Sequence, residues 1–324
     1  MLYPILRSFV KLGLNWYVSD WQLKNLQYAD HNNPAVIVSN HPNSFFDALI
    51  ITVHQPSEIC FLTRGDIFEK PWANWVLRTF FMLPIYKKND GEDAEISNAF
   101  TYDECVRQLK MGRKLLIFPE GVSRNHIDLK PFMTTGLNSI IQRAVQMDVP
   151  IQVQPYILSY NSFDFNPKAV YLEALEPIDS TDYLNNSEVM TNEIIKKVRG
   201  EMDNHMLNSF VGETEGIRKS REWMKFPAIA GKYTHNWYYQ LVKKQVLKKT
   251  ENTIFYDSLL FAVLLFTYPV IIFLLSVIIG SITGFWWGFL IFILLPFLSY
   301  CWIQYQPVKI GGENLDDRVN KLNP

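Results

Sequence analysis

The residues best suited to chemistry begin with a histidine and an aspartate near residue 40. His41 follows the apolar run 35–39, and Asp47 stands a few positions later, at the start of a helical pattern. In α/β folds, active groups collect where strands end. A carboxylate that accepts one imidazole N–H leaves the other ring nitrogen free as a base near physiological pH. Because a histidine beside an aspartate is also typical of a capped turn, the pair alone does not identify a catalytic site.

A second block of interest, Phe-Pro-Glu-Gly-Val-Ser-Arg at residues 118–124, ends another apolar run that starts at residue 114. Arg124 is suited to holding a phosphate, because the guanidinium fork matches phosphate oxygens. Glu120 would orient that arginine or a free hydroxyl of the substrate, and Gly121 would let the backbone approach closely. A purely structural ion pair between Glu120 and Arg124 at a strand end is the alternative.

Taken together, the two blocks resemble those of the glycerophospholipid acyltransferase superfamily, whose members carry N-H-x-x-x-x-D followed by F-P-E-G-x-S-R. The resemblance covers residues 30–175. It implies an O-acyltransferase that moves a fatty acyl chain from acyl-CoA or acyl carrier protein to the hydroxyl of a lysophospholipid or glycerol phosphate. In that reading His41 takes the hydroxyl proton and Asp47 stabilises the imidazolium. The acceptor-binding residues would include Glu120, Gly121, Ser123 and Arg124.

Two weaker blocks of the same superfamily are present in the same order. The segment 83–88, Leu-Pro-Ile-Tyr-Lys-Lys, resembles the block whose basic residue contacts the acceptor phosphate, a role that falls on Lys87 with Lys88 as its competitor. The segment 149–155 resembles a proline-bearing strand that shapes the acyl-donor pocket, and its prolines are Pro150 and Pro155. The acyl donor is a substrate in this reading, and no bound cofactor is expected.

One spacing departs from the superfamily pattern, because five residues instead of four separate His41 from Asp47. On a regular helix one extra residue turns a side chain by about 100°. The residues 42–44, Pro-Asn-Ser, must therefore form a turn that absorbs the difference. Some branches of the superfamily, including certain glycerol-3-phosphate acyltransferases, share the longer spacing, which leaves the acceptor open. We expect 1-acylglycerol-3-phosphate, with glycerol 3-phosphate or a lyso-aminolipid as alternatives.

Two other classes of protein compete with this interpretation. A serine hydrolase would need Ser123 within a G-x-S-x-G elbow, but the segment 121–125, Gly-Val-Ser-Arg-Asn, lacks the final glycine. A non-catalytic lipid-binding membrane module could keep the fold, although the joint presence of both blocks argues against a loss of activity. Acceptor-dependent consumption of a thioester distinguishes the transferase from both.

Composition excludes some partners and points toward a membrane. Lys and Arg total 31 against 32 Asp and Glu, so no excess of charge favours a nucleic-acid partner. Aromatic residues reach 15% of the chain and include 9 Trp, a side chain that favours membrane interfaces. Cys60, Cys105 and Cys301 are scattered and no histidine stands at ligand spacing, so neither a disulfide framework nor a metal site is expected.

The C-terminal part carries the clearest membrane signal, because no charged residue occurs from Ser258 through Val308. A spanning helix needs about 20 apolar residues, and the breaker at 280–284 divides the stretch into spans at 258–279 and 285–302. Lysines precede the first span and follow the second. By the positive-inside rule, this places both termini and the catalytic domain on the cytoplasmic side. Two buried helices of a soluble core are the alternative.

The expected fold class is α/β, with a mixed central sheet flanked by helices. Apolar runs predict strands at 35–39, 59–62, 83–86, 114–118, 151–158 and 169–172, with crossover helices at 96–111 and 136–147. The predicted organisation is an amphipathic membrane-interface helix at 1–27, the acyltransferase domain at 28–185, a helical stalk at 186–257, the transmembrane hairpin at 258–303 and a cytoplasmic tail at 304–324. A helix packed on the sheet is an equal alternative for 1–27.

Overall fold

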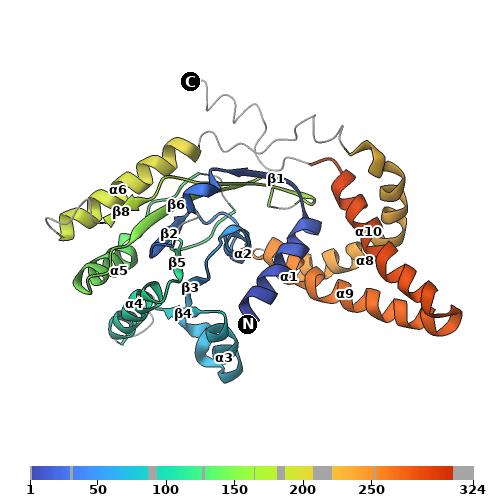
Figure 1. The fold of residues 1–324 in the computed structure, drawn as a ribbon, viewed down its shortest axis with the longest axis horizontal. Helices are drawn as coiled ribbons and strands as arrows, with labels where there is room; N and C mark the ends of the chain where they lie inside the picture. The colour runs from blue at the N-terminus through green and yellow to red at the C-terminus, as the bar shows by residue number, and fades with distance from the viewer. Residues whose placement is uncertain are drawn as a thin grey trace.

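The computed structural model describes residues 2–29, 32–86, 93–125, 128–163, 165–180, 187–206, 221–251 and 253–308. Its centre is an eight-stranded sheet (Figure 1). The strands are β1 Val18–Lys24, β2 Ala35–Ser39, β3 Ile59–Arg64, β4 Met82–Ile85, β5 Lys114–Ile117, β6 Gln152–Tyr160, β7 Lys168–Ala174 and β8 Ile178–Asp179. They follow the order β1-β7-β6-β2-β5-β3-β4 across the sheet, and β8 pairs with β6.

The sheet is mixed, which confirms the predicted fold class. Strands β6, β2, β5, β3 and β4 run parallel, whereas β7 and β8 pair with β6 in the antiparallel direction. All six strands expected from apolar runs are present, with ends within two residues of the prediction. The central strand β2 shows why the pattern was readable, because every residue in it is buried, as in a parallel strand covered on both faces.

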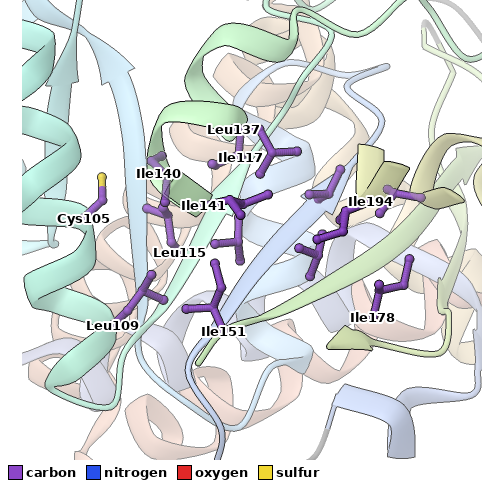
Figure 2. Packing of buried hydrophobic residues seen from close by; sticks show 14 of the residues in the cluster. Cys105, Leu109, Leu115, Ile117, Leu137, Ile140, Ile141, Ile151, Ile178 and Ile194 are labelled. Carbon is purple, nitrogen blue, oxygen red and sulfur yellow. The ribbon is translucent and has the colours of Figure 1, made fainter. Parts of the chain in front are cut away.

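Helices cover both faces of the sheet. The α-helices of the described residues are α1 Leu2–Tyr17, α2 Phe45–His54, α3 Pro71–Thr79, α4 Ala94–Lys110, α5 Thr134–Gln146, α6 Ser187–Met206, α8 Lys225–Thr250, α9 Tyr256–Thr283 and α10 Phe285–Tyr305. Because side chains alternate along a strand, Val36 and Leu115 pack on one face with α4, α5 and α6, a core seen in Figure 2. Ile37 and Leu116 pack on the other face with α1, α2 and the first turns of α9.

The structure corrects the helix predicted over residues 1–27. The helix α1 ends at Tyr17, and the next residues form the edge strand β1, which pairs with β7 in parallel. Without β1, one edge of β7 would present unpaired backbone N–H and C=O groups. In α1 itself, Val10 and Leu14 are buried against the protein, while Leu2 and Ile5 are exposed.

The predicted stalk at 186–257 is also corrected. The helix α6 packs against α5 and β6, and its buried residues Ile194, Val198 and Met202 belong to the core of the sheet. These residues recur at helical spacing, so they form an apolar stripe that covers the sheet. The helix α8, in the second half of the segment, packs on the C-terminal helices α9 and α10.

The helices α9 and α10 form a hairpin that projects away from the sheet (Figure 1). Both are long and apolar enough to cross a membrane, and only 11% and 17% of their most apolar windows are buried. Such low burial does not fit two helices in a soluble core, where most residues would be covered. The two helices approach each other closely at Gly280 and Gly288, where a Cβ on Gly288 would lie 2.8 Å from the Cα of Gly280. Small residues commonly permit such contact between membrane helices.

Candidate active site

The two sequence blocks meet at one edge of the sheet, where the parallel strands β2 and β5 end side by side. The ring of His41 stacks on Phe118, with 3.9 Å between ring centroids and 8° between the ring planes. The backbone N–H of Arg124 donates to the carbonyl oxygen of His41 at 3.3 Å. Residues from both blocks therefore form a single site.

Asp47 is the buried partner of His41 in the first turn of α2, and its side chain has no exposed surface. Its Oδ2 accepts hydrogen bonds from His41 Nδ1 at 2.8 Å and from the backbone N–H of Asn43 at 2.8 Å. Its Oδ1 accepts a third hydrogen bond, from the hydroxyl of Tyr160 at 2.7 Å. Because Nδ1 is engaged, Nε2 is the nitrogen of His41 left for a substrate, and the side chain is 18% exposed.

Opposing effects act on the pKa of Asp47. Burial raises this pKa and dominates, while the hydrogen bonds from His41, Tyr160 and Asn43 favour the ionised carboxylate and oppose the rise. A buried carboxylate with a raised pKa is a strong hydrogen-bond acceptor. It holds the imidazole in one tautomer and stabilises positive charge on the ring, which is what a general base requires.

The turn at residues 42–44 brings Asp47 back to His41 despite the longer spacing. Ser44 has φ 53° and ψ −140°, in the positive-φ region that L residues seldom adopt. Its backbone N–H donates to Ser123 Oγ at 2.6 Å, so the second block holds the turn. The side chain of Asn40 fixes the start of the loop to β6, donating to the carbonyl of Leu158 at 2.7 Å and accepting from its N–H at 2.8 Å.

The other residues of the second block lie beside His41 and Asp47, which together form the dyad. Glu120 is buried, and its Oε1 accepts from the backbone N–H of Lys130 at 3.3 Å. Burial raises the pKa of Glu120, and backbone N–H groups oppose the rise. Gly121 has φ 70°, and a Cβ there would overlap the sulfur of Met133. Arg124 is exposed, and among the described residues its guanidinium forms no ion pair, with Glu120 or with any other.

The structure does not gather all the residues expected from the weaker blocks. Pro155 is buried in the middle of β6. Pro150 precedes β6 at the opposite end of the strands from His41. It lies six residues before Tyr156, the partner of Ser39 at the end of β2, which is about 20 Å at about 3.3 Å per residue. Lys87 and Lys88 lie outside the described residues. Within the described part of the chain, no group of three or more His, Cys, Asp or Glu side chains stands ready to hold a metal ion.

Sequence reasoning missed two residues that support the dyad but lie far from it along the chain. Tyr160 ends β6, 113 positions from its partner Asp47. Asp257 begins α9, 214 positions from Asn43, whose Nδ2 donates to it at 2.8 Å. No local motif marks either residue. The one signal for Asp257 is its place directly before the uncharged stretch that starts at Ser258.

Comparison with known proteins agrees with the motifs. Residues 20–158 match the Acyltransferase family model. A lyso-ornithine lipid O-acyltransferase of Rhodobacter capsulatus is 24% identical over 141 residues, covering 42% of this chain and 47% of that protein. A 1-acyl-sn-glycerol-3-phosphate acyltransferase of Helicobacter pylori is 27% identical over 134 residues, covering 41% of this chain and 52% of that protein. The match therefore spans about half the length of these relatives.

Among solved structures, the 1-acyl-sn-glycerophosphate (LPA) acyltransferase PlsC from Thermotoga maritima superposes with a TM-score of 0.48 at 18% identity, over 65% of this chain and 81% of that chain. The span matched by the family model holds His41 and Asp47 and the block 118–124, which meet at one site. Residues 20–158 therefore match the Acyltransferase family, which supports the resemblance of this domain to the glycerophospholipid acyltransferase superfamily.

Proposed function

We propose that this protein is an O-acyltransferase that moves a fatty acyl chain from an acyl thioester to the hydroxyl of a lysophospholipid-type acceptor. The observation that carries the proposal is the geometry of His41. Its Nδ1 is held by the buried Asp47, and its Nε2 has no hydrogen-bond partner among the described residues. An imidazole arranged in this way can accept a proton from a substrate hydroxyl.

The proposed reaction needs no covalent enzyme intermediate. His41 Nε2 takes the proton from the acceptor hydroxyl as its oxygen attacks the thioester carbonyl carbon. A C–O bond forms and the C–S bond breaks. The proton then passes from the imidazolium to the leaving thiolate, and Asp47 stabilises the imidazolium between the two transfers. Either acyl-CoA or an acyl carrier protein would supply the thioester.

Arg124 is the residue best suited to hold the acceptor head group. Its guanidinium is exposed, and such a fork binds phosphate oxygens through two hydrogen bonds. This favours 1-acylglycerol-3-phosphate as the acceptor. A lyso-ornithine lipid, which carries an amino-acid head in place of phosphate, is the second candidate, because two relatives carry that substrate in their names.

The position of the hairpin supports the proposal that the substrate is a lipid. Asp257, the second residue of α9, contacts the catalytic loop, whereas the exposed apolar surface of this helix begins near Phe266. At about 1.5 Å per residue, the two points are about 14 Å apart along the helix. If the hairpin enters a bilayer, His41 would lie close to the membrane surface, where single-chain lipids are held. The cytoplasmic orientation of the domain stays a prediction.

Thiol release from acyl-CoA by the purified full chain in detergent tests the proposal. Release that requires 1-acylglycerol-3-phosphate or lyso-ornithine lipid, with the diacyl product identified by mass spectrometry, is the expected result. His41→Ala should abolish it, whereas His54→Ala, at the far end of α2, should not. Release without acceptor would indicate a hydrolase, and no release from acyl-CoA or from an acyl carrier protein thioester would indicate a non-catalytic lipid-binding protein.

A further inference from the structure

The base of the hairpin is bonded directly to the catalytic loop. Asp257 is fully buried in the first turn of α9. Its Oδ2 accepts from Asn43 Nδ2 at 2.8 Å and lies 2.6 Å from the buried Nζ of Lys168. Its Oδ1 accepts from the hydroxyl of Tyr17 at 3.0 Å, at the end of α1. One carboxylate thus joins the loop, the sheet, the N-terminal helix and the hairpin.

Asn43 stands between two carboxylates. Its backbone N–H donates to Asp47, the partner of the catalytic base, while its side-chain amide donates to Asp257. A second bond acts three residues later, where the backbone N–H of Phe46 donates to Ser258 Oγ at 3.0 Å. That N–H belongs to the first turn of α2, where it has no partner within its own helix, and it also donates to the carbonyl of Asn43 at 3.2 Å. Both links therefore act on the segment that separates His41 from Asp47.

Stabilisation of the fold alone does not explain this arrangement. The cost of removing two charges from water offsets most of their attraction, so a buried pair such as Lys168 and Asp257 is a weak source of stability compared with apolar packing. The loop between His41 and Asp47, however, is not stabilised by its own backbone conformation. It carries one residue more than the common superfamily spacing, and Ser44 adopts positive φ, so its own backbone does not favour this turn.

We infer that Asp257 and Ser258 are positioning residues for the dyad, which hold residues 43–46 so that the carboxylate of Asp47 meets His41. The inference rests on the proposed function and extends it, because it makes the first turn of the hairpin part of the active-site framework. The hairpin then has two roles, as a membrane anchor and as a support of the catalytic loop. Neither Asp257 nor Ser258 touches the reacting atoms.

Three substitutions in the full chain separate positioning from general stability. Asn43→Ala removes the amide that reaches Asp257 but keeps the backbone N–H to Asp47 and the buried pair with Lys168. Ser258→Ala removes one hydroxyl, and Ser258→Thr restores it. The matched control is Gln304→Ala in α10, because Gln304 is a buried polar link between the hairpin and the N-terminal segment, donating to the carbonyls of Asn15 and Val18 without touching the loop.

The measured quantities are kcat, KM for donor and acceptor, and the thermal midpoint of each variant. We expect Asn43→Ala and Ser258→Ala to lower kcat by roughly 10- to 100-fold, because small misplacements of catalytic groups are costly, with both KM values near wild type. Ser258→Thr should recover most of the kcat. Gln304→Ala should lower the thermal midpoint and leave kcat unchanged.

Two failures are distinguishable. If the wild-type chain is active and both loop variants keep its kcat per folded molecule, with at most a lower thermal midpoint as in Gln304→Ala, the positioning role is wrong while the proposed function stands. If the wild-type chain shows no acceptor-dependent thiol release, the proposed function itself fails and the positioning role fails with it.

Discussion

Replacing Tyr160 by phenylalanine isolates the hydrogen bond that its hydroxyl donates to Asp47. The bond is 2.7 Å long and fully buried, and its acceptor is a carboxylate whose other oxygen is held by His41. A hydrogen bond to a charged group contributes about 1.5–3 kcal/mol to stability. Because Oδ2 and His41 are untouched, we expect Tyr160→Phe to lower the free energy of unfolding by about this amount at neutral pH and to keep the dyad in place.

The strand offers a matched control in Tyr156, which lies four residues earlier in β6. Tyr156 is also buried, and its hydroxyl donates to Gln55 Oε1 at 2.9 Å. A bond to a neutral acceptor contributes about 0.5–1.5 kcal/mol. Tyr156→Phe therefore makes the same chemical change in the same strand, without a carboxylate at the other end of the bond.

The two variants should differ most clearly in their dependence on pH. The hydrogen bond from Tyr160 lowers the pKa of Asp47 and stabilises the fold only while that carboxylate is ionised. Its contribution is present at neutral pH and is lost as the pH falls through the folded-state pKa of Asp47, so the cost of Tyr160→Phe should shrink in acid. The cost of Tyr156→Phe should not change with pH.

Urea unfolding of the detergent-solubilised protein at several pH values measures these costs, and acyl transfer across the same range provides a second readout. The lost donor raises the proton affinity of the His41–Asp47 pair, whichever residue holds the proton. The acidic limb of kcat/KM should therefore move to higher pH in Tyr160→Phe and stay in place in Tyr156→Phe. Equal, pH-independent costs in the two variants would refute this reasoning.

Three further predictions concern the second block. Arg124→Ala should raise the KM for a phosphate-bearing acceptor by roughly 10-fold or more while the KM for the donor stays near wild type, which steady-state kinetics would show. Gly121→Ala should lower the thermal midpoint more than Gly112→Ala, because both have positive φ but only the first would push a Cβ into Met133. Burial raises the pKa of Glu120 above its unfolded-state value. The protonated side chain therefore stabilises the fold below the unfolded-state pKa, and this stabilisation is lost as the pH rises through the folded-state pKa. In thermal unfolding, Glu120→Gln should gain stability relative to wild type above about pH 4.

The central sheet and the position of the dyad could be predicted because their signals are local. Each buried parallel strand is a short apolar run. Asn40 and His41 directly follow β2, and Glu120 stands three residues after the end of β5. Strands of this kind end at one edge of a sheet, so the two blocks could be expected to meet without knowledge of their contacts. The longer spacing also predicted a turn at 42–44, and Ser44 provides it.

The parts that could not be predicted depend on partners far away in the chain. The strand β1 exists because β7 has a free edge, and α6 joins the domain because it covers one face of the sheet. Neither segment is distinctive by itself. An edge strand of mixed polarity reads as a continuation of the helix before it, and a charged amphipathic helix reads as a stalk when the surface that it covers is unknown.

The support of Asp47 shows the same limit in chemical terms. A buried carboxylate is stable only when several donors reach it, and the sequence paired Asp47 with His41 but indicated no other partner. It could not say that one would be Tyr160, at the end of β6, or that the turn carrying another would itself be held by Asp257. The uncharged stretch predicted a hairpin that starts at Ser258, which left Asp257 at the end of the predicted stalk. Its contacts with Lys168 and Asn43 connect the start of the hairpin to the loop between His41 and Asp47, so we expect a change at the start of the hairpin to alter the position of His41 relative to Asp47.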